Sequence, residues 1–586
     1  MTNPRDALRE ALIEAERLDR AGDARGAIAA LSRAVELRPD LAPAHARLGI
    51  LLQEMGQVPH AIDHLRVATR LAPGDAAAWN NLAAALLEIG DLAGCESAAR
   101  RAVESDPSHL LAWELLGESL LRQARLGRAQ AALSEAVRID PGRASAWARL
   151  GSALLHSGRI PEALEAMARG ESLAPPDAAQ IGSSRLLAMH YDPRHDRSSI
   201  FEAHQAWAAR YEPAPMIEPF RNARGLQRPL RVAYVSPRFH DSTLMRLLEP
   251  VLRHHDPRAV EVWCYAVTPI ENEIIRGARS LAARWVDASA LDDRSLALRM
   301  RDDAIDIAVD LAGHAPGNRL RAFAQRPAPV CMSWLDYFDT TGIAAMDFLV
   351  TDKWHSPEDG GQRFTEEPLR LSRVRFCYEP PAEAPEVVTP AAGRIPVLAS
   401  FNRGAKLSAE TLDAWRLALD AVPGARLLIK NSSLDHAEER DAFSRRIAAA
   451  GVDPSRVELR GFSEYAQMLD QYNGVDVVLD TFPYNGGVTT LEALWMGRPV
   501  VTIRGDTMVS RQGVALLSAV GLEDLVASDA HAFARIVAAI AYDTPRRASL
   551  ALELRDRMRR SPLLDAPGMA RALEAAYHVA WRRFVA

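Results

Sequence analysis

The 586-residue chain has few lysines, few cysteines and no long apolar run. Nowhere do about 18 uncharged apolar residues occur together, so the sequence predicts no membrane-spanning helix. The N-terminal stretch, MTNPRDALREALIEAERL, is amphipathic and acidic, which argues against a secretion signal and favours a cytoplasmic protein. No two cysteines form a CxxC pair, so we expect buried thiols rather than disulfides or a zinc site. The four are Cys95, Cys264, Cys331 and Cys377.

The chain also lacks an excess of positive charge. Its formal net charge is −6 at pH 7, and basic residues are mixed with acidic ones along the whole length. Nucleic-acid phosphates are bound by basic faces, so this balance argues against a nucleic-acid partner. Hydrophobic residues at 48% and charged residues at 25% are typical of a globular protein, and the length predicts roughly three or four domains.

The first third of the chain repeats with a period of 34 residues. The period is marked by Pro39, Pro73, Pro107, Pro141 and Pro175, by Trp79, Trp113 and Trp147, and by alanines at 27, 61, 129 and 163 and at 34, 68, 102 and 136. Each unit predicts two antiparallel helices that approach closely at the alanines. The pattern resembles the tetratricopeptide repeat over residues 8–177, in five units. Such arrays form a right-handed superhelix whose concave face receives a protein segment. A spacer or a dimerisation surface is the alternative.

Residues 179–228 predict a mixed helical and coil connector. Three histidines cluster in it, at His190, His195 and His204, and their spacing matches no common metal-ligand pattern. We therefore expect solvated or helix-capping histidines there, and no metal.

From Pro229 the chain alternates short apolar runs with helical stretches, which is typical of parallel strands covered on both faces. One set of runs falls at residues 230–236, 261–267, 305–311 and 329–335, and a second at 395–401, 425–431, 457–462, 475–481 and 498–505. A stretch rich in proline and acidic residues separates them. Two successive Rossmann-like domains are predicted, with a substrate cleft between the carboxyl ends of their strands.

The stretch DTFPYNGGVTTLEALW, residues 480–495, predicts a strand end, a glycine-bearing loop and the start of a helix. Thr489 stands where an N-cap belongs, and Glu492 would complete a T-x-x-E capping box. The unpaired amides of such a helix also suit a diphosphate, with Thr489 and Thr490 adding hydroxyls and Glu492 reaching a ribose. From geometry alone, a well-capped helix and an anion cradle are equally good interpretations.

Four stretches taken together carry a family resemblance: RPAPVCMSWLDYFDTTG, SFNRGAKLS, DTFPYNGGVTTLEALWMGRPVVTIRGD and the closing helix that begins with SP. In this order, behind tetratricopeptide repeats, they resemble the SPINDLY and O-GlcNAc transferase family of protein O-glycosyltransferases, over nearly the whole chain. The resemblance implies a tetratricopeptide superhelix followed by a GT-B module of two Rossmann-like domains. It also implies metal-independent, inverting transfer from a nucleotide sugar to Ser or Thr of a protein, without a further cofactor. The sequence of residues 481–497, TFPYNGGVTTLEALWMG, looks closer to the SPINDLY branch, whose plant members use GDP-fucose.

The expected domains follow from the repeat, the strand sets and the resemblance. They are the repeat array at 1–178, the connector at 179–228, an acceptor-side domain at 229–375, a linker at 376–394, a nucleotide-sugar domain at 395–560 and C-terminal helices at 561–586.

The resemblance assigns the donor site residue by residue. Lys406 matches the lysine that contacts the donor diphosphate. The chain has only three lysines and 67 arginines, so the choice of lysine at this position favours a specific role. A compact ammonium stabilises the charge that grows on the departing diphosphate. Further donor-side positions are Asn402, Arg403, Gly487, Val488, Thr489, Thr490, Glu492 and Asp506, with Gly505 and Arg511 nearby.

The acceptor side departs from the family pattern. The family offers a histidine where this chain has Ser242, whereas His240 and Asp241 stand just before it. A histidine suits proton removal from a hydroxyl at neutral pH. Two interpretations are equally good: His240 replaces the family histidine, or this loop has lost the proton-accepting role. Gly313, His314 and residues 327–334 match positions of the acceptor wall, and Asp336 and Tyr337 follow them.

We therefore expect a protein O-glycosyltransferase in which Lys406 and His240 are catalytic. The repeats recruit the acceptor protein, for which bacterial flagellin is one candidate. The UDP-GlcNAc branch of the family has a donor-recognising histidine where Gly487 stands, so the donor cannot be carried over from the resemblance. UDP-GlcNAc, GDP-fucose and a CMP-linked nonulosonic acid all remain candidates. The alternative is an inactive scaffold that binds partners through its repeats, and the altered loop at Ser242 favours it.

Overall fold

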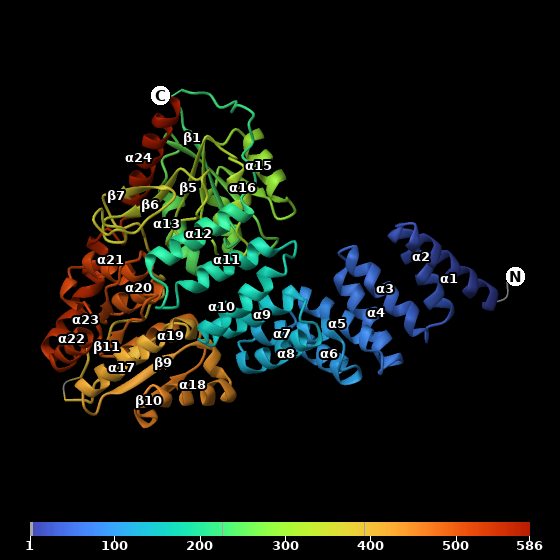
Figure 1. Cartoon of the computed structure of the whole chain (residues 1–586), viewed down its shortest axis with the longest axis horizontal. Coiled ribbons are helices and arrows are strands. Elements are labelled where there is room, and N and C mark those ends of the chain that lie inside the picture. The colour runs from blue at the N-terminus through green and yellow to red at the C-terminus, as the bar shows by residue number, and fades with distance from the viewer. Residues whose placement is uncertain (1–3, 226, 392) are drawn as a thin grey trace. The chain divides into compact units, whose positions relative to one another are not determined.

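A computed structural model describes residues 4–225, 227–391 and 393–586. By its internal contacts the chain forms two compact units, one of residues 1–157 and 165–175, the other of residues 158–164 and 176–586. Each unit is described here by itself (Figure 1).

The first unit consists of antiparallel helix pairs in sequence order. Its helices are α1 (Pro4–Arg20), α2 (Ala24–Leu37), α3 (Ala42–Glu54), α4 (Val58–Leu71), α5 (Ala76–Glu88), α6 (Leu92–Ser105), α7 (Leu110–Arg122), α8 (Leu126–Ile139) and α9 (Ala144–His156), and α10 (Ile160–Ser172) contributes its second half. The predicted alanine positions are all buried, and Cys95 fills the same position in the third repeat. The 34-residue array predicted from the sequence is confirmed.

The tryptophans and glycines of the repeats hold the helices at a fixed spacing. The indole Nε1 atoms of Trp79, Trp113 and Trp147 each donate a 2.9 Å hydrogen bond to the carbonyl oxygen of the proline six residues earlier. A Cβ atom at Gly117 would lie 2.4 Å from Leu133 Cγ, so only glycine allows the two helices of that repeat to approach so closely.

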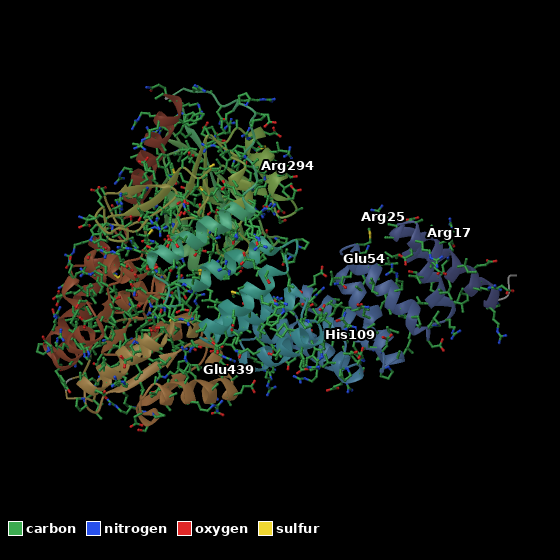
Figure 2. The ribbon with its side chains drawn as sticks, in the orientation of Figure 1. Arg17, Arg25, Glu54, His109, Arg294 and Glu439 are labelled. Atoms are coloured by element: carbon green, nitrogen blue, oxygen red, sulfur yellow. The ribbon has the colours of Figure 1, made fainter. Side chains whose placement is uncertain are left out.

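Charges of both signs are interspersed on the outside of this unit. Arg17 on α1, Arg25 on α2 and Glu54 on α3 are all exposed (Figure 2). No helix of the described residues is both long enough and apolar enough to cross a bilayer.

The second unit contains two parallel sheets. The first has the strand order β3-β2-β1-β4-β5-β6-β7 and the second the order β10-β9-β8-β11-β12-β13. The strands of the first sheet are β1 (Leu230–Ser236), β2 (Val260–Ala266), β3 (Arg284–Asp287), β4 (Ile307–Asp310), β5 (Val330–Ser333), β6 (Phe348–Asp352) and β7 (Glu367–Leu371). Those of the second are β8 (Val397–Ser400), β9 (Arg426–Lys430), β10 (Val457–Arg460), β11 (Val477–Leu479), β12 (Val500–Ile503) and β13 (Val526–Ala527). Both orders are those of doubly wound nucleotide-binding sheets.

Helices connect the strands. Those of the first sheet are α13 (Ser242–His254), α14 (Glu273–Leu281), α15 (Asp293–Asp302) and α16 (Leu320–Ala324). Those of the second are α17 (Ala409–Ala421), α18 (Ala437–Ala449), α19 (Tyr465–Gln471), α20 (Val488–Trp495), α21 (Gln512–Ser518), α22 (Ala530–Tyr542) and α23 (Thr544–Arg560). All nine strands expected from the sequence are present, and the sequence missed β3, β6, β7 and β13, which are short or lie at or near a sheet edge.

The connector is part of the first sheet's core. Side chains of β1 alternate between two apolar clusters: Val232 and Tyr234 face α13, α14 and the C-terminal helix α24 (Ala566–Val585), whereas Ala233 and Val235 face the other side. That other side is covered by α15, α16 and the connector helices α11 (Ala178–Met189) and α12 (Arg197–Tyr211). The connector therefore belongs structurally to the acceptor-side sheet.

The ends of the second unit return to the first sheet. Helix α24 contacts α13, β5 and β7, and it lies along the first sheet in Figure 1. The predicted linker has no helix or strand among its described residues, but it is anchored, since Tyr378 N donates to Leu563 O at 2.7 Å and Arg498 donates to Val388 O. All four cysteines are free and buried, as predicted.

Candidate functional site

The second sheet has its switch point between β8 and β11, where the strand order reverses. The loops that follow these two strands therefore meet at the carboxyl edge of the sheet. The first loop carries Asn402, Arg403 and Lys406, and the second runs from Asp480 to Gly487. Ligands of open α/β sheets bind at this position.

The loop after β11 is held in one conformation by its own strand and by α17. The Asp480 carboxylate accepts hydrogen bonds from Gly486 N at 2.6 Å, Thr481 N at 2.8 Å and Thr502 Oγ1 at 2.7 Å. A Cβ atom at Gly486 would lie 2.7 Å from Thr490 Oγ1 and 2.8 Å from Thr489 Oγ1, so the loop has no room for a side chain there. Asp480 was missed from the sequence, although a carboxylate at the end of a buried strand is a signal for this role.

Helix α20 begins two positions earlier than the sequence predicted. Gly487 is its N-cap, without a side-chain cap, and Thr490 Oγ1 donates back to Gly486 O at 3.2 Å. The predicted capping box of Thr489 and Glu492 is therefore wrong. The first amides of a helix have no intrahelical acceptor, and among the described residues none accepts from Val488 N or Thr489 N. Of the two interpretations left open by the sequence, the structure favours the unpaired anion cradle.

Lys406 lies beside this cradle with its ammonium group directed at the loop after β11. Its Nζ donates to Asn485 O at 2.7 Å and lies 4.3 Å from the centre of the Tyr484 ring. Burial and, to a smaller extent, the nearby Arg403 charge lower the pKa of Lys406 to about 7, while Asp480 opposes the shift. The two loops also meet through Thr489 Oγ1, which donates to Asn402 Oδ1 at 3.2 Å.

A cavity of about 360 Å³ opens at the same edge of the sheet. It is lined by residues that follow β8, β9 and β10 and by the first turns of α20: Phe401, Lys430, Asn431, Ser432, Gly461, Phe462, Ser463, Glu464, Tyr465, Met468, Thr489 and Glu492. Its volume lies within the usual range of small-molecule sites, and its lining is mostly aromatic, aliphatic and small polar. Thr489 joins the cavity to the Lys406 side of the helix start.

Glu492 is buried in the wall of this cavity. Its carboxylate accepts a hydrogen bond from Tyr465 Oη at 2.8 Å. Burial raises the pKa of Glu492 to about 7, although the Tyr465 hydrogen bond and the Arg246 charge oppose the shift. The carboxylate is therefore placed to accept from a hydroxyl in the cavity.

The predicted acceptor side lies at the carboxyl edge of the first sheet. Arg238 donates to the carboxylates of Asp241 and Asp336, both at 2.5 Å, and Asp241 also caps α13 by accepting from Thr243 N at 2.7 Å. Burial raises the pKa of Asp336 to about 6, opposed by Arg238 and by Arg403 of the second sheet's loop. Phe338 in the loop after β5 meets Tyr484 in the loop after β11 with ring centres 4.8 Å apart, so these loops of the two sheets face each other.

His240 and Ser242 differ in how they are held. His240 is half-buried, and in the described part of the chain no hydrogen bond engages either of its ring nitrogens. Only its backbone carbonyl is bonded, by Asn272 Nδ2 at 3.1 Å. Ser242 is exposed at the first position of α13. The imidazole of His240 is therefore the group on this loop that is free to exchange a proton.

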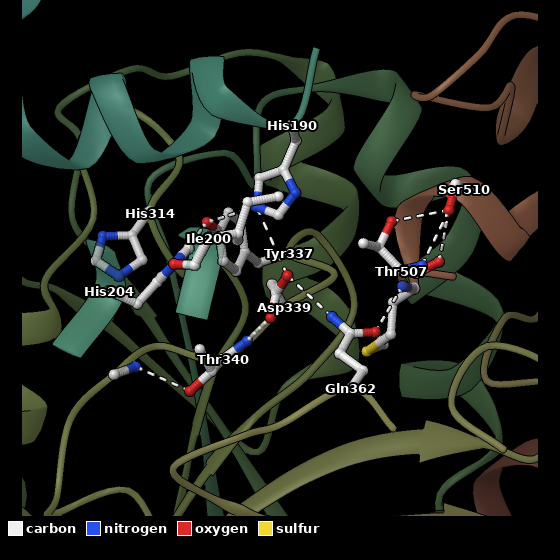
Figure 3. Close-up of polar contacts among 12 residues, drawn as sticks. His190, Ile200, His204, His314, Tyr337, Asp339, Thr340, Gln362, Thr507 and Ser510 are labelled. Carbon is white, nitrogen blue, oxygen red and sulfur yellow. Dashed lines mark hydrogen bonds and ion pairs between the residues drawn. The ribbon is translucent and has the colours of Figure 1, made fainter. Parts of the chain in front are cut away.

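His314 lies in the protein interior rather than on the acceptor wall. It is fully buried, and its ring nitrogens are engaged by Ser183 Oγ and Thr341 O, both at 2.9 Å. Figure 3 shows it beside His204 and Tyr337. The structure therefore does not support the acceptor-side role predicted for His314.

The histidines of the connector are part of the same buried network. His190 and His204 are fully buried, so the predicted solvated role is wrong for both, although His190 is the C-cap residue of α11. His195 is partly exposed. The Tyr337 hydroxyl lies 2.7 Å from His204 Nε2 and 3.3 Å from His190 Nε2. Sequence spacing alone gave no signal for this cluster, because Tyr337 is 133 residues from His204.

Three of the predicted donor-side residues lie in a cavity separate from the one next to Thr489. Gly505, Asp506 and Arg511 line a separate cavity of about 80 Å³, together with His355 and Gln362. Asp506 is 63% exposed there and lies 3.9 Å from Arg197. The structure therefore does not place Asp506 with the donor residues around Thr489.

Comparison with known proteins identifies both parts of the chain. A model described as glycosyl transferase family 41 matches residues 209–377 and 392–573, and a tetratricopeptide repeat model matches residues 46–109, 95–144 and 115–178. The family match thus covers more than half of the chain and both parallel sheets.

Two relatives and one solved structure extend this result. The Arabidopsis thaliana protein named probable UDP-N-acetylglucosamine–peptide N-acetylglucosaminyltransferase SPINDLY is 34% identical over 70% of this chain and 46% of its own length. The corresponding Arabidopsis thaliana protein named SEC is 28% identical over 62% of this chain and 38% of its own length. The chain thus spans about half the length of the curated relatives it matches. A lysine-to-methionine mutant of the Thermobaculum terrenum O-GlcNAc transferase superposes with a TM-score of 0.82 at 34% identity, covering 87% of this chain and 98% of that one.

Proposed function

The chain belongs to glycosyl transferase family 41, and from this premise we propose that it transfers a sugar from a nucleotide-sugar donor to Ser or Thr hydroxyls of a protein. Its GT-B fold of two facing parallel sheets gives the donor and the acceptor one sheet edge each. The tetratricopeptide repeats recruit the acceptor protein.

One observation carries the donor side of the proposal. The Lys406 ammonium and the unpaired amides of Val488 and Thr489 lie at a single switch point, next to a cavity large enough for a nucleoside. When the bond between the anomeric carbon and the phosphate oxygen breaks, negative charge grows on the leaving diphosphate. An ammonium and backbone amides that are already in place stabilise this charge without reorganisation.

On the acceptor side, His240 takes the proton of the attacking hydroxyl. Its imidazole is half-buried, without a hydrogen-bond partner among the described residues, and lies in the loop after β1. The hydroxyl oxygen attacks the anomeric carbon opposite the leaving group, so the configuration inverts. An imidazole has a reference pKa near 6.5 and suits this transfer at neutral pH.

The donor and the acceptor are chosen by groups outside the reacting centre. The base and ribose fill the 360 Å³ cavity, where Glu492 accepts from a ribose hydroxyl. UDP-GlcNAc, the donor in the relatives' names, is the first donor to test, followed by GDP-fucose and a CMP-nonulosonic acid. Flagellin is the first acceptor to test.

The test is a donor panel on the purified chain. A donor that binds only the folded protein raises its melting temperature, by an amount set by concentration and affinity. We expect one class among UDP-, GDP- and CMP-sugars to do so, and we expect mass spectrometry to show that sugar on a co-expressed acceptor. Lys406→Ala should reduce transfer by about 10²–10³-fold, as removal of a preorganised charge-stabilising group does.

Lys353→Ala is the matched control, because Lys353 is an exposed lysine of the first sheet's loop. Near-normal transfer by Lys406→Ala would remove the proposed role of that lysine. If no donor shifts the melting temperature and no sugar is transferred, the chain is a scaffold that binds partners through its repeats.

A further inference from the structure

The ring of Tyr484 contacts the ammonium group of the proposed catalytic lysine. Tyr484 stands in the loop after β11, one residue before the carbonyl of Asn485 that accepts from Lys406 Nζ. The ammonium lies 4.3 Å from the Tyr484 ring centre, within the range of a cation–π interaction. Tyr484 is 8% exposed, so this interaction is shielded from water.

The connector provides the second contact of the same ring. Tyr191, one residue after the histidine that ends α11, stacks on Tyr484 with ring centres 4.5 Å apart and an interplanar angle of 27°. The ammonium of Lys406 and the ring of Tyr191 therefore both contact the ring of Tyr484. Phe338 meets Tyr484 at 4.8 Å in a T-shaped contact. Tyr484 is thus enclosed by Lys406, the connector and the first sheet.

The residues next to Tyr191 and Phe338 are fixed by the buried histidine network. His204 Nδ1 donates to Ile200 O at 2.7 Å, because a carbonyl oxygen only accepts. The unprotonated Nε2 of the neutral ring then accepts from the Tyr337 hydroxyl at 2.7 Å. His190 packs edge-on against Phe338 with ring centres 5.2 Å apart. Figure 3 shows His190, His204 and Tyr337 together. The backbones that carry Tyr191 and Phe338 are therefore anchored on both sides.

We propose that Tyr484 and Tyr191 are positioning residues for Lys406, so that the connector is a working part of the donor site rather than a tether. Tyr484 holds the ammonium over its ring, and Tyr191 holds Tyr484 in place. This inference rests on the proposed function only for its effect on transfer, since the placement of the lysine can be measured without a donor.

The ring has a measurable effect on the charge of Lys406. The charged groups that face this ammonium are Arg403, which disfavours the cation, and Asp480, which favours it. Burial already lowers the pKa of Lys406 to about 7. An aromatic face favours the protonated amine, so replacing it with an aliphatic side chain of similar burial lowers the pKa further.

The experiment uses the scarcity of lysine in this chain. Trace acetylation with acetic anhydride over a range of pH reports the deprotonated fraction of each lysine, and only Lys353, Lys406 and Lys430 are present. We expect Tyr484→Leu to lower the labelling midpoint of Lys406 by about one pH unit, and Tyr484→Phe, which keeps the aromatic face, to leave it unchanged. Tyr191→Leu should lower the midpoint by a smaller amount, because Tyr484 remains but is no longer held.

Tyr542→Leu is the matched control, since Tyr542 is 58% exposed on α22. Transfer activity is measured as nucleotide release, with the donor that stabilises the protein. For Tyr484→Leu, kcat at pH 8 should fall about 10-fold with little change in KM, and the loss of activity at high pH should begin at a lower pH.

An unchanged Lys406 midpoint in Tyr484→Leu, or an equal shift in Tyr484→Phe, would overturn the proposal. If the midpoints shift as expected but the wild-type chain uses no donor, the placement of Lys406 stands and the transferase function fails. Should Tyr484→Leu not fold, Tyr191→Leu decides by the same measurement.

Discussion

The two sheets share the strand order of a doubly wound fold, but the side chains and amides at their carboxyl edges are bonded differently. At the second sheet, the amides of Val488 and Thr489 at the start of α20 have no acceptor in the described part of the chain, and Lys406 lies in the neighbouring loop. Thr489 also lines the open cavity. At the first sheet, Arg238 pairs with Asp241 and Asp336, and His314 is bonded through both ring nitrogens. One edge is prepared to bind an anion, and the other is largely satisfied by its own side chains.

The difference follows from what each edge has to recognise. A diphosphate is small and highly charged, so fixed amides and one ammonium recognise it with little dependence on the rest of the fold. A protein hydroxyl carries no charge, so its recognition depends on a proton acceptor and on a segment delivered by the partner. In the loop after β1, the ring nitrogens of His240 have no hydrogen-bond partner among the residues that the structure describes.

The largest expected effect that separates the two edges comes from their histidines. His240→Ala should reduce kcat by about 10²–10⁴-fold with little change in melting temperature, because it removes a proton acceptor whose ring makes no hydrogen bond among the described residues. His314→Ala should instead lower the melting temperature, because it leaves Ser183 and Thr341 without their buried partner. Transfer kinetics and thermal denaturation of both variants provide the comparison.

His531→Ala, at an exposed position on α22, controls for the loss of a histidine as such. If His314→Ala inactivates the enzyme while remaining as stable as the wild type, the proton acceptor is His314 and the assignment moves.

A smaller effect is expected where the donor edge has no spare room. Gly486→Ala places a Cβ atom 2.7 Å from Thr490 Oγ1 and 3.1 Å from Asp480 Oδ1, so the loop or the helix start must shift. We expect donor affinity to fall about 10-fold or more, measured as a smaller donor-induced rise in melting temperature. Gly474→Ala is the matched control, because a Cβ atom there meets nothing within 4 Å. Equal donor affinity in the two variants would show that the amides at α20 do not bind the donor.

The repeat array and the donor edge could be predicted because their signals are local in sequence. The 34-residue period, the apolar runs and the stretch from Asp480 to Trp495 each lie within a short window, and backbone geometry follows directly from them. The wrong prediction of Thr489 as the N-cap also has a cause within this short stretch. Two glycines precede the helix, and Gly487 rather than a hydroxyl residue became the N-cap, which left Thr489 free to contact Asn402.

The acceptor edge and the connector could not be predicted because their partners are distant in sequence. His204 and Tyr337 are 133 residues apart, and Ser183 and His314 are 131 apart. Tyr191 and Tyr484 are separated still further, and no pattern along the chain connects a residue after α11 with the loop after β11. These histidines are core residues because the packed fold buries them, and burial by distant segments cannot be deduced from their spacing in the sequence.

The smallest expected effect concerns the charge of Glu492 and is a test within the donor edge. The pKa of this carboxyl is raised from 4.5 to about 7 in the folded chain, so between these values the folded state binds more protons than the unfolded state. Stability therefore falls as pH rises through this window, and the loss is complete above pH 7. Glu492→Gln keeps an oxygen for Tyr465 Oη and removes the charge, so its melting temperature should exceed that of the wild type by about 2–4 °C at pH 8 and equal it near pH 4.

Glu410→Gln, at an exposed position on α17, should show no such difference at any pH. Saturating donor should reverse the order at pH 8, because a ribose hydroxyl that donates to the ionised carboxylate stabilises the wild type more than the amide variant. If donor raises both melting temperatures equally, Glu492 does not contact the donor, and its buried carboxylate serves only Tyr465. The donor edge would then consist of the amides of α20 and Lys406 alone, and selection of the nucleotide would depend on the other residues of the cavity.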